Sequence, residues 1–309
     1  MAVTRGRVLV TGGAGFIGVN LAPVLAEHGF TTRCYDDFST GHRSDAERAG
    51  YDEILQGDIL DAGALGEAAR GCTHVVHLAA QAGVPTSVED PVADCELNVR
   101  GTLHALLAAR EAGVAGFVFA SSNAPLGEIT PPAHEEVVPR PTSPYGASKL
   151  AGEAYCSAFA GSYGVPTTVL RFSNVYGPFS YHKGSVVASF CKSAVAGEPL
   201  IVYGDGSQTR DYVYVEDLCR GIAAAATAGG TGVLAHLGSG TETTVLEVAR
   251  LVAERVGGAA VEHRPARVGD VARSSADISR ARTLFGFAAR VTLEEGLDRT
   301  VRWFQESDA

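Results

Sequence analysis

The sequence predicts an α/β protein whose core is a doubly wound parallel sheet, joined to a smaller C-terminal lobe. Three observations support this prediction. Short apolar runs alternate with longer helical patterns through the first half of the chain. A glycine-rich turn connects the first of these runs to the first helical pattern. After about residue 173, loops that contain Gly and Pro replace the alternation.

Six apolar runs have the length and the β-branched content of buried strands. They cover residues 7–10, 31–35, 54–56, 75–78, 117–120 and 167–170. The helices expected between them cover residues 16–28, 62–70, 92–112 and 145–163. Because crossover helices cover both faces of a parallel sheet, ligands are expected at the carboxyl ends of its strands.

The second half of the chain predicts the smaller lobe. A helix is expected at residues 186–196, followed by a turn-rich stretch at 197–208. Residues 211–227 are expected to return to the large domain as a strand and a helix, and the segments 244–256 and 293–304 finish the smaller lobe. We therefore expect a large domain of residues 1–172 plus about 210–236, and a lobe of about 173–209 and 237–309.

The chain has 309 residues, with 35 acidic and 25 basic side chains and a net charge of −10. This balance argues against broad contact with nucleic acid, which needs many Lys and Arg side chains near phosphates. No window approaches the length of apolar sequence that a membrane span needs, and the first residues lack the pattern of a signal peptide. The six cysteines form no CxxC pair, so we expect buried free thiols, no metal site and a cytoplasmic location.

The apolar run at residues 7–10 leads into the sequence TGGAGFIG and then into a helical pattern. In this context Gly12 permits a tight turn, and Gly15 lets backbone N–H groups approach a pyrophosphate at the positive end of the helix. Gly18 permits close packing of the helix on the strand. Together these features indicate a dinucleotide-binding turn.

The next predicted strand ends at Asp36 and Asp37. A carboxylate at this position accepts hydrogen bonds from the adenosine ribose and repels the 2′-phosphate of NADP. We therefore expect NAD, although Arg43 in the following loop keeps NADP open. Asp58 follows the third strand, where it can touch the adenine edge. His77 ends the fourth strand, and a histidine there is more often a hydrogen-bonded structural residue than a catalyst.

Tyr145 and Lys149 lie four residues apart after the helix-starting pair Ser143-Pro144, so both side chains project from one helix face. A nearby ammonium favours ionised tyrosine. We expect Lys149 to lower the Tyr145 pKa and to make the phenol a usable general acid or base. Ser122 ends the fifth predicted strand at the sheet edge where this helix begins, so its hydroxyl can share a hydrogen bond with a substrate hydroxyl.

The motifs TGGAGFIG, YDDFSTG, GDI, HLAAQ, SSN, SPYGASK, RFSNVYGP, YGDGSQTRDYVYVEDL and ARVGD stand in this order along essentially the whole chain. On these motifs the chain resembles the extended short-chain dehydrogenase/reductases, specifically the NAD-dependent nucleotide-sugar epimerases and dehydratases. Among them it is most similar to the UDP-glucose 4-epimerases. The resemblance implies a Rossmann domain that binds NAD, a lobe that binds a nucleotide sugar, and a transient 4-keto sugar.

The resemblance also implies roles for individual residues. Tyr145 transfers the proton, and Ser122 orients the sugar. Lys149 tunes the acidity of Tyr145 and anchors the nicotinamide ribose. The residues implied in NAD binding are Gly12, Gly15, Phe16, Ile17, Asp36, Asp37, Ser39, Asp58, Ile59, Leu78, Ala79, Ala80, Gln81, Asn98, Tyr145, Lys149 and Phe172. Those implied in binding a UDP-sugar are Thr86, Ser122, Asn174, Val187, Tyr203, Arg210, Arg267 and Asp270. For Arg210, a surface ion pair with Asp205 or Asp211 is the alternative.

One triplet distinguishes the reactions of the family. The dehydratases that the chain resembles usually carry Thr-Asp-Glu there, and the UDP-glucuronate decarboxylases carry Thr-Ser-Glu. This chain has Ser122-Asn123-Ala124. This triplet fits the Ser-first pattern of 4-epimerases. After RFSNVYGP, only His182 and Lys183 stand in place of the Arg that uronate epimerases tend to carry. A neutral hexose is therefore favoured over a uronic acid.

Two departures from the family pattern border the expected sugar site. Pro125-Leu126-Gly127 replaces Val-Tyr-Gly, and Pro85-Thr86 replaces a frequent Arg. The alternatives that stay open are a UDP-glucuronate 4-epimerase or decarboxylase, a 4,6-dehydratase, a reductase, and a non-enzymatic dinucleotide sensor. Apolar residues on helices 92–112 and 145–163 predict a homodimer, as in relatives, and we expect no nucleic acid or membrane partner.

Overall fold

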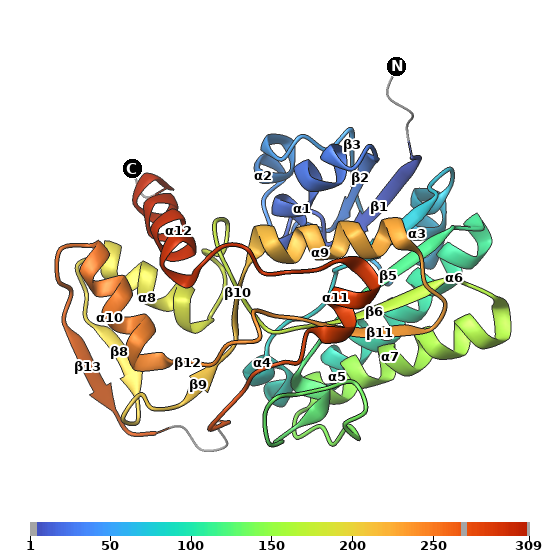
Figure 1. Cartoon of the computed structure of the whole chain (residues 1–309). Coiled ribbons are helices and arrows are strands. Elements are labelled where there is room, and N and C mark those ends of the chain that lie inside the picture. The colour runs from blue at the N-terminus through green and yellow to red at the C-terminus, as the bar shows by residue number, and fades with distance from the viewer. Residues whose placement is uncertain (1–4, 267–270, 308–309) are drawn as a thin grey trace.

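The computed structural model describes residues 5–266 and 271–307. Its centre is a seven-stranded sheet with the order β11-β6-β5-β4-β1-β2-β3 (Figure 1). All neighbouring strands in it are parallel. The strands are β1 (Arg7–Thr11), β2 (Thr31–Asp36), β3 (Glu53–Gln56), β4 (His74–His77), β5 (Gly116–Ser122), β6 (Thr167–Phe172) and β11 (Val233–Leu237). From β1 the chain adds β2 and β3 on one side and then β4, β5, β6 and β11 on the other. The predicted doubly wound class is therefore confirmed.

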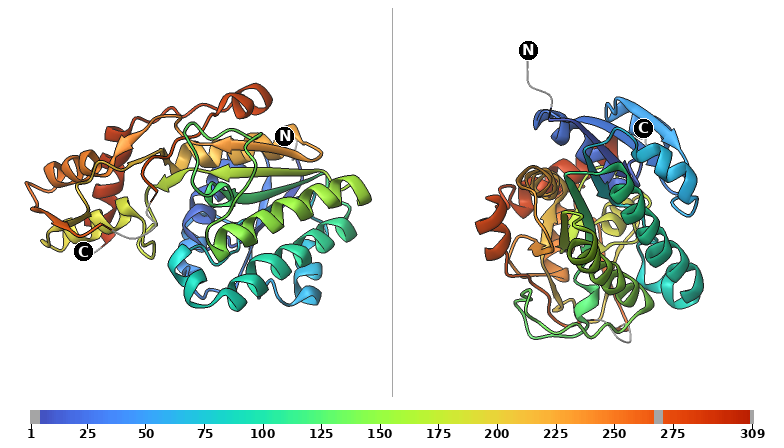
Figure 2. Two further views of the ribbon diagram at one scale, coloured as in Figure 1. Left: turned by 90° about the horizontal axis from the view of Figure 1, so that it is seen from below. Right: turned by 90° about the vertical axis from the view of Figure 1, so that its right-hand side faces the viewer.

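Helices cover both faces of this sheet (Figures 1 and 2). On one face lie α3 (Ala62–Ala69), α6 (Gly101–Ala112) and α7 (Pro144–Tyr163). On the other lie α1 (Phe16–Glu27), α9 (Val215–Ala228) and α11 (Ser279–Phe285). Leu65, Leu106 and Phe159 are buried in the first layer, and Leu25 and Ile222 in the second. Apolar side chains therefore close both faces, which leaves the strand ends as the place for ligands.

Shorter helices lie between the strands of the large domain. They are α2 (Arg43–Arg48), α4 (Val84–Glu89), α5 (Pro91–Cys95) and a 3-10 turn at Ala124–Leu126. The single helix expected at 92–112 is interrupted, because Glu96–Arg100 forms a π-helical turn between α5 and α6. Such turns are frequent at functional sites. Here the turn carries Asn98, whose carbonyl accepts a hydrogen bond from the Thr102 hydroxyl at 2.6 Å.

The smaller lobe lies to one side of the sheet (Figure 2, left view). Its helices are α8 (Val186–Val195), α10 (Val245–Arg255) and α12 (Leu293–Ser307). Its strand pairs are β8 (Leu200–Tyr203) with β13 (Val261–Arg264), and β9 (Thr209–Arg210) with β12 (Thr243–Thr244). Leu200 and Val202 of β8 are fully buried. The expected turn-rich stretch at 197–208 thus contains a core strand.

The return to the large domain differs from the expectation. β10 (Tyr212–Tyr214) pairs with β7 (Asn174–Tyr176) outside the seven-stranded sheet. Only α9 returns as expected, because it packs against α1. The strand that joins the main sheet is β11, which pairs with β6. The sequence analysis missed β11 because five residues beside a Gly-rich segment give too short a pattern.

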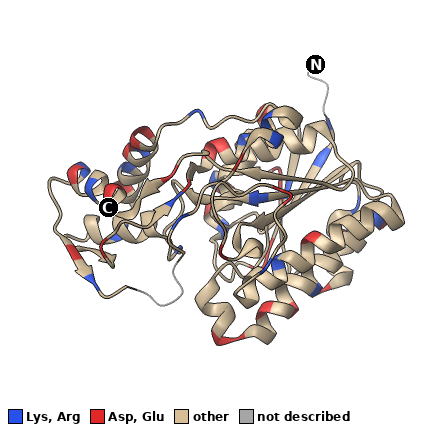
Figure 3. Cartoon of the chain, turned by 60° about the horizontal axis from the view of Figure 1, so that its bottom comes forward, with Lys and Arg blue, Asp and Glu red and all other residues tan. Residues whose placement is uncertain are grey.

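Acidic and basic residues are interspersed over both lobes (Figure 3). Some form ion pairs along one helix, such as Arg299 with Glu295. Five cysteines are buried free thiols as expected, but Cys95 is exposed, because it lies at the solvent-facing end of α5. Within residues 5–266 and 271–307, no helix is both long and apolar enough to cross a membrane.

Candidate active site

The glycine-rich turn lies at the carboxyl end of β1. Gly12 has a φ of +69°, and a Cβ there would come within 2.7 Å of the Ala79 backbone nitrogen. A Cβ on Gly18 would come within 2.5 Å of the Gly13 carbonyl oxygen. Gly15 caps α1 without any side chain accepting from the first-turn N–H groups, and no acidic residue lies in that turn. The turn therefore presents open backbone donors, which suit an anion such as a diphosphate.

Asp36 ends β2 beside this turn. Its Oδ2 accepts from the Ala14 N–H at 3.0 Å and its Oδ1 from the Phe38 N–H at 2.8 Å. Burial raises the pKa of this carboxyl. Because each carboxylate oxygen has a second lone pair, Asp36 can still accept from a ribose hydroxyl. Arg43, the residue that kept NADP open, lies over the Phe38 ring at 5.6 Å and pairs with Glu47 at 3.4 Å.

Other predicted cofactor residues border the same edge. Asp37 is exposed, and its Oδ1 accepts from both the Ser39 N–H and the Ser39 hydroxyl. Asp58 Oδ1 accepts from the Leu60 N–H at 2.8 Å, and Ile59 is buried. The side chains of Leu78, Ala79 and Ala80 are half-buried beyond β4. Phe16 is buried, Ile17 packs beside it, and Phe172 lies opposite Ser122 in the register of β5 and β6.

His77 is a structural residue of the β4 end, as interpreted from the sequence. Its ring nitrogens contact the Thr11 hydroxyl at 2.7 Å and the Thr102 hydroxyl at 3.1 Å. Burial, with a smaller effect of Lys149, lowers the pKa of His77 to about 3. The ring is therefore neutral at physiological pH and both of its nitrogens are occupied.

Asn98 holds the segment after β4 in place. Its Nδ2 donates to the Gln81 carbonyl at 3.0 Å, and its Oδ1 accepts from the Gln81 N–H at 2.8 Å. The same Nδ2 lies 2.9 Å from Asp94 Oδ1 and 3.3 Å from the Ser148 hydroxyl. The predicted cofactor residues 78–81 are thus fixed to α7 through one buried amide.

Tyr145 and Lys149 lie in the first turns of α7, where Ser143 accepts from the Gly146 N–H at 3.1 Å and Pro144 begins the helix. Lys149 is buried, and its ammonium donates to the Ala120 carbonyl at 2.9 Å. It lies 5.9 Å from the centre of the Tyr145 ring. Burial lowers the Lys149 pKa to about 8, opposed chiefly by the negative charge of Asp94.

Ser122 and Tyr145 meet at the carboxyl end of β5. The Ser122 hydroxyl lies close enough to the phenol to favour its ionised form. Burial outweighs this effect and raises the Tyr145 pKa to about 12. The expected lowering of this pKa by Lys149 is therefore wrong, because desolvation of the phenolate is the larger effect. The predicted trio nevertheless comes together, with Ser122 Oγ also accepting from the Ala124 N–H at 3.2 Å.

The predicted substrate residues are spread over both lobes. Thr86 is exposed on α4, Asn174 is exposed on β7, Val187 is buried in α8, and Tyr203 ends β8. Arg210 Nη1 donates to the carbonyls of Thr209 at 2.8 Å and Val271 at 2.6 Å. Arg267 and Asp270 lie outside the described residues.

The alternative partners of Arg210 have hydrogen bonds elsewhere. Asp211 is fully buried and accepts from the backbone of Ser239, Gly240 and Ala276. Asp205 accepts from Ser207. In residues 5–266 and 271–307, no group of three or more His, Cys, Asp or Glu side chains could hold a metal ion.

A family model described as the NAD dependent epimerase/dehydratase family matches residues 8–236. The chain belongs to this family. It is 39% identical to the UDP-glucose 4-epimerase of Mycolicibacterium smegmatis, over 97% of this chain and 98% of that protein.

Two solved structures share the fold over nearly the whole chain. The UDP-glucose 4-epimerase of Thermotoga maritima with UDP-glucose has a TM-score of 0.92 and 36% identity, and 98% of this chain and 100% of that chain are covered. The UDP-glucose 4-epimerase of Thermus thermophilus in complex with NAD has a TM-score of 0.90 and 39% identity, with 97% and 99% covered.

The structure of this family member fits NAD, the cofactor that the family description names. The glycine turn leaves backbone N–H groups open at the start of α1, and Asp36 lies beside it. A buried carboxylate there disfavours a 2′-phosphate on the same ribose. The glycine turn and Asp36 at β1 and β2 lie at the same edge of the sheet as the cluster of Ser122, Tyr145 and Lys149 at β5 and α7.

Sequence reasoning missed two features of this family member's site. Glu153, four residues after Lys149, accepts from the Ser121 hydroxyl at 2.5 Å and from Arg171, which fixes α7 against β5 and β6. The sequence did carry a signal for Glu153, because Tyr145, Lys149 and Glu153 follow one another at a spacing of four residues, which places them on one helix face. Lys183 was noted only as a charge near the sugar, but its ammonium lies over Phe16 at the start of α1.

Proposed function

We propose that this protein is an NAD-dependent 4-epimerase of a UDP-hexose of the UDP-glucose and UDP-galactose type. The observation that carries the proposal is the Ser122, Tyr145 and Lys149 cluster at the same sheet edge as the glycine turn. Proton transfer from a sugar hydroxyl needs an acid–base group beside a hydride acceptor. The 39% identical relative and the two solved neighbours described above support the same reaction.

In this reaction the Tyr145 phenolate accepts the proton of the 4-hydroxyl while the C4 hydride leaves the sugar, which gives a 4-keto sugar. Bound NAD supplies the hydride acceptor and later the donor. Tyr145 returns the proton when the carbonyl is reduced on its other face, so no net oxidation occurs. Ser122 orients the hydroxyl through its contact with Tyr145. Because burial disfavours the Tyr145 anion, a protonated Lys149 stabilises that anion during the transfer.

The residues at the elimination positions favour epimerisation over dehydration or decarboxylation. Asn123 and Ala124 carry no carboxyl group that could protonate a leaving hydroxyl. Asn123 is hydrogen-bonded instead, with its Oδ1 3.0 Å from His236 Nδ1 and its Nδ2 3.5 Å from the Ser173 hydroxyl. These contacts hold its amide against β11 and the residue that follows β6.

We also propose which ligand each lobe binds. Residues 1–172 with about 210–236 bind NAD through the predicted positions at the ends of β1, β2 and β4. Residues of about 173–209 and 237–309 bind the UDP part, with Asn174, Tyr203, Arg210, Arg267 and Asp270 among its contacts. Arg suits a diphosphate because its planar fork donates two hydrogen bonds at once.

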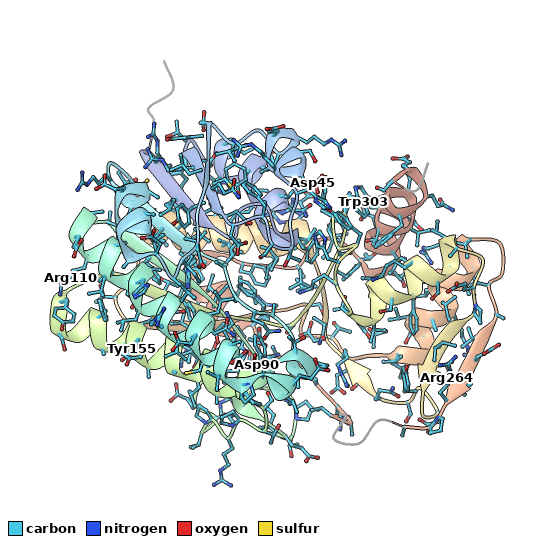
Figure 4. The ribbon with its side chains drawn as sticks, turned by 180° about the vertical axis from the view of Figure 1, so that it is seen from behind. Asp45, Asp90, Arg110, Tyr155, Arg264 and Trp303 are labelled. Carbon is cyan, nitrogen blue, oxygen red and sulfur yellow. The ribbon has the colours of Figure 1, made fainter. Side chains whose placement is uncertain are left out.

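We also propose a cytoplasmic homodimer. Tyr155 and Tyr163 of α7 are 38% and 55% exposed. Tyr155 lies on the side of the large domain formed by α6 and α7 (Figure 4). Aromatic side chains exposed on neighbouring helices suit a helix-bundle interface. Sedimentation velocity of the wild type and of Tyr155→Glu tests this part, and a wild-type monomer at micromolar concentration contradicts it.

The reaction itself is tested by incubating the purified protein with UDP-glucose, UDP-N-acetylglucosamine and UDP-glucuronate in parallel, without added cofactor. The proposal expects a UDP-hexose product of unchanged mass whose C4 proton becomes equatorial in the proton NMR spectrum. Loss of water or carbon dioxide indicates a dehydratase or a decarboxylase. If all three sugars stay unchanged even with added NAD, the UDP-hexose assignment is wrong.

A further inference from the structure

The loop between β7 and α8 belongs to the smaller lobe but is fastened to the large domain. The Asn20 side chain on α1 donates to the Pro178 carbonyl at 3.1 Å. The Tyr181 hydroxyl donates to Asp45 Oδ2 on α2 at 2.7 Å. The Tyr181 ring stacks between His42, at 5.5 Å, and Trp303 of α12, at 5.7 Å. Figure 4 labels Asp45 and Trp303 where these elements meet.

This fastening places Lys183 against the glycine-rich turn. The Lys183 N–H donates to the Ser180 carbonyl at 3.0 Å, which closes the loop. Its ammonium lies 5.8 Å from the centre of the Phe16 ring. Phe16 is the first residue of α1 and directly follows Gly15, the helix cap. A cation of the smaller lobe thus lies beside the open N–H groups of the large domain.

The Lys183 ammonium makes no hydrogen bond or ion pair with any described residue, and its pKa is lowered by burial alone. Its charge also contributes, as the smallest of the effects, to the lowered pKa of Lys149. A partly buried cation without an anionic partner is unfavourable. An anion that binds between the Lys183 ammonium and the open N–H groups of α1 would supply the missing partner.

We propose that Lys183 binds the diphosphate of NAD from the smaller lobe, opposite the amide groups of the glycine-rich turn. This inference rests on the cofactor of the proposed function. The ammonium and the helix terminus then neutralise the two phosphates from opposite sides. Because the contact bridges the lobes, the cofactor is retained through the catalytic cycle, as an epimerase requires, since the hydride must return to the same sugar.

A diphosphate also occurs in the UDP part of the substrate, so the test measures both. Cofactor-free Lys183→Gln, Lys183→Arg and wild-type proteins are titrated with NAD alone and with UDP alone by calorimetry. We expect Lys183→Gln to raise the Kd for NAD at least tenfold and to leave the Kd for UDP within twofold. Lys183→Arg keeps the charge and should recover most of the NAD affinity. The thermal unfolding of each variant without ligand verifies that it is folded.

Lys192 offers the matched control. Lys192 lies on α8, and its ammonium donates to the carbonyls of Tyr181 and Lys183, so Lys192→Gln removes an equal charge that contacts the same loop from the helix. We expect it to leave the NAD affinity within twofold. An equal loss in Lys192→Gln would show that loop position matters rather than the Lys183 charge, and would overturn the proposal.

Two further outcomes also overturn it. One is an unchanged Kd for NAD in folded Lys183→Gln. The other is a raised Kd for UDP with an unchanged Kd for NAD, which assigns the ammonium to the substrate diphosphate. Neither measurement uses a sugar or depends on turnover, so the failure of this proposal is distinguishable from failure of the epimerase assignment.

Discussion

Glu153 and Arg171 form a two-point ion pair beneath the active site. Arg171 Nε lies 2.8 Å from Glu153 Oε1, and Arg171 Nη2 lies 2.6 Å from Oε2. Arg171 is 1% exposed and Glu153 9%. Ser121, the neighbour of Ser122, donates to the same carboxylate. The pair therefore joins α7, which carries Tyr145 and Lys149, to the strands that carry Ser122 and Phe172.

Removing one member of this pair should strongly destabilise the fold. Glu153→Gln leaves the buried Arg171 charge without its partner, and we expect a loss of about 3 to 5 kcal/mol in the free energy of unfolding. Urea denaturation measures it. The control is the double variant Glu153→Met with Arg171→Met, which removes both charges and should be less destabilised than Glu153→Gln. A loss below about 1 kcal/mol in Glu153→Gln would contradict this role.

Replacing the acid–base group should abolish turnover without removing the cofactor site. Tyr145→Phe keeps the ring but has no phenolic oxygen to accept and return the proton, so we expect kcat to fall about 10²- to 10⁴-fold. NAD bound per chain, measured after denaturation by absorbance, should stay near that of the wild type. Near wild-type turnover in Tyr145→Phe would exclude this residue as the acid–base group.

The pH profile should show the titration of Lys149. Burial lowers its pKa to about 8, so the ammonium is present below that pH and lost above it. Because the charge stabilises the Tyr145 anion, we expect kcat to decline as pH rises through about 8. The descending limb should shift upward in Lys149→Arg, since guanidinium stays protonated. A flat wild-type profile up to pH 10 would show that the Lys149 charge does not control the rate.

His77 should make the fold sensitive to acid. Its pKa is lowered to about 3 in the folded protein, against about 6.5 in the unfolded chain. Below about pH 6.5 the unfolded state binds a proton that the folded state excludes, so stability falls by about 1.4 kcal/mol per pH unit toward pH 3 from this group.

Denaturation midpoints between pH 4 and 6.5 measure this slope. His77→Asn should be less stable than the wild type at pH 7 but should lose stability less steeply on acidification. The exposed His263 at the surface of β13 gives a control, because His263→Asn should leave the slope unchanged. Equal slopes in wild type and His77→Asn would contradict the buried neutral state of His77.

The strand–helix alternation, the glycine turn and the spacing of Tyr145 and Lys149 are local patterns, and the sequence alone was enough to predict them. A parallel sheet needs an amphipathic crossover after each strand, and the turn needs Gly12 at positive φ. These requirements act within about thirty residues of chain. The fold class, and the proximity of Ser122, Tyr145 and Lys149 to one another, could therefore be predicted from residue order.

Only the tertiary structure decided features that depend on distant segments. β11 is a strand because β6 offers it a partner, and the Tyr145 pKa is high because burial outweighs the Lys149 charge. Lys183 reaches Phe16, which lies far earlier in the chain, only because Tyr181 and Asp45 fasten the loop. Pairing, desolvation and charge depend on distances in space, and the sequence determines these only through the complete fold.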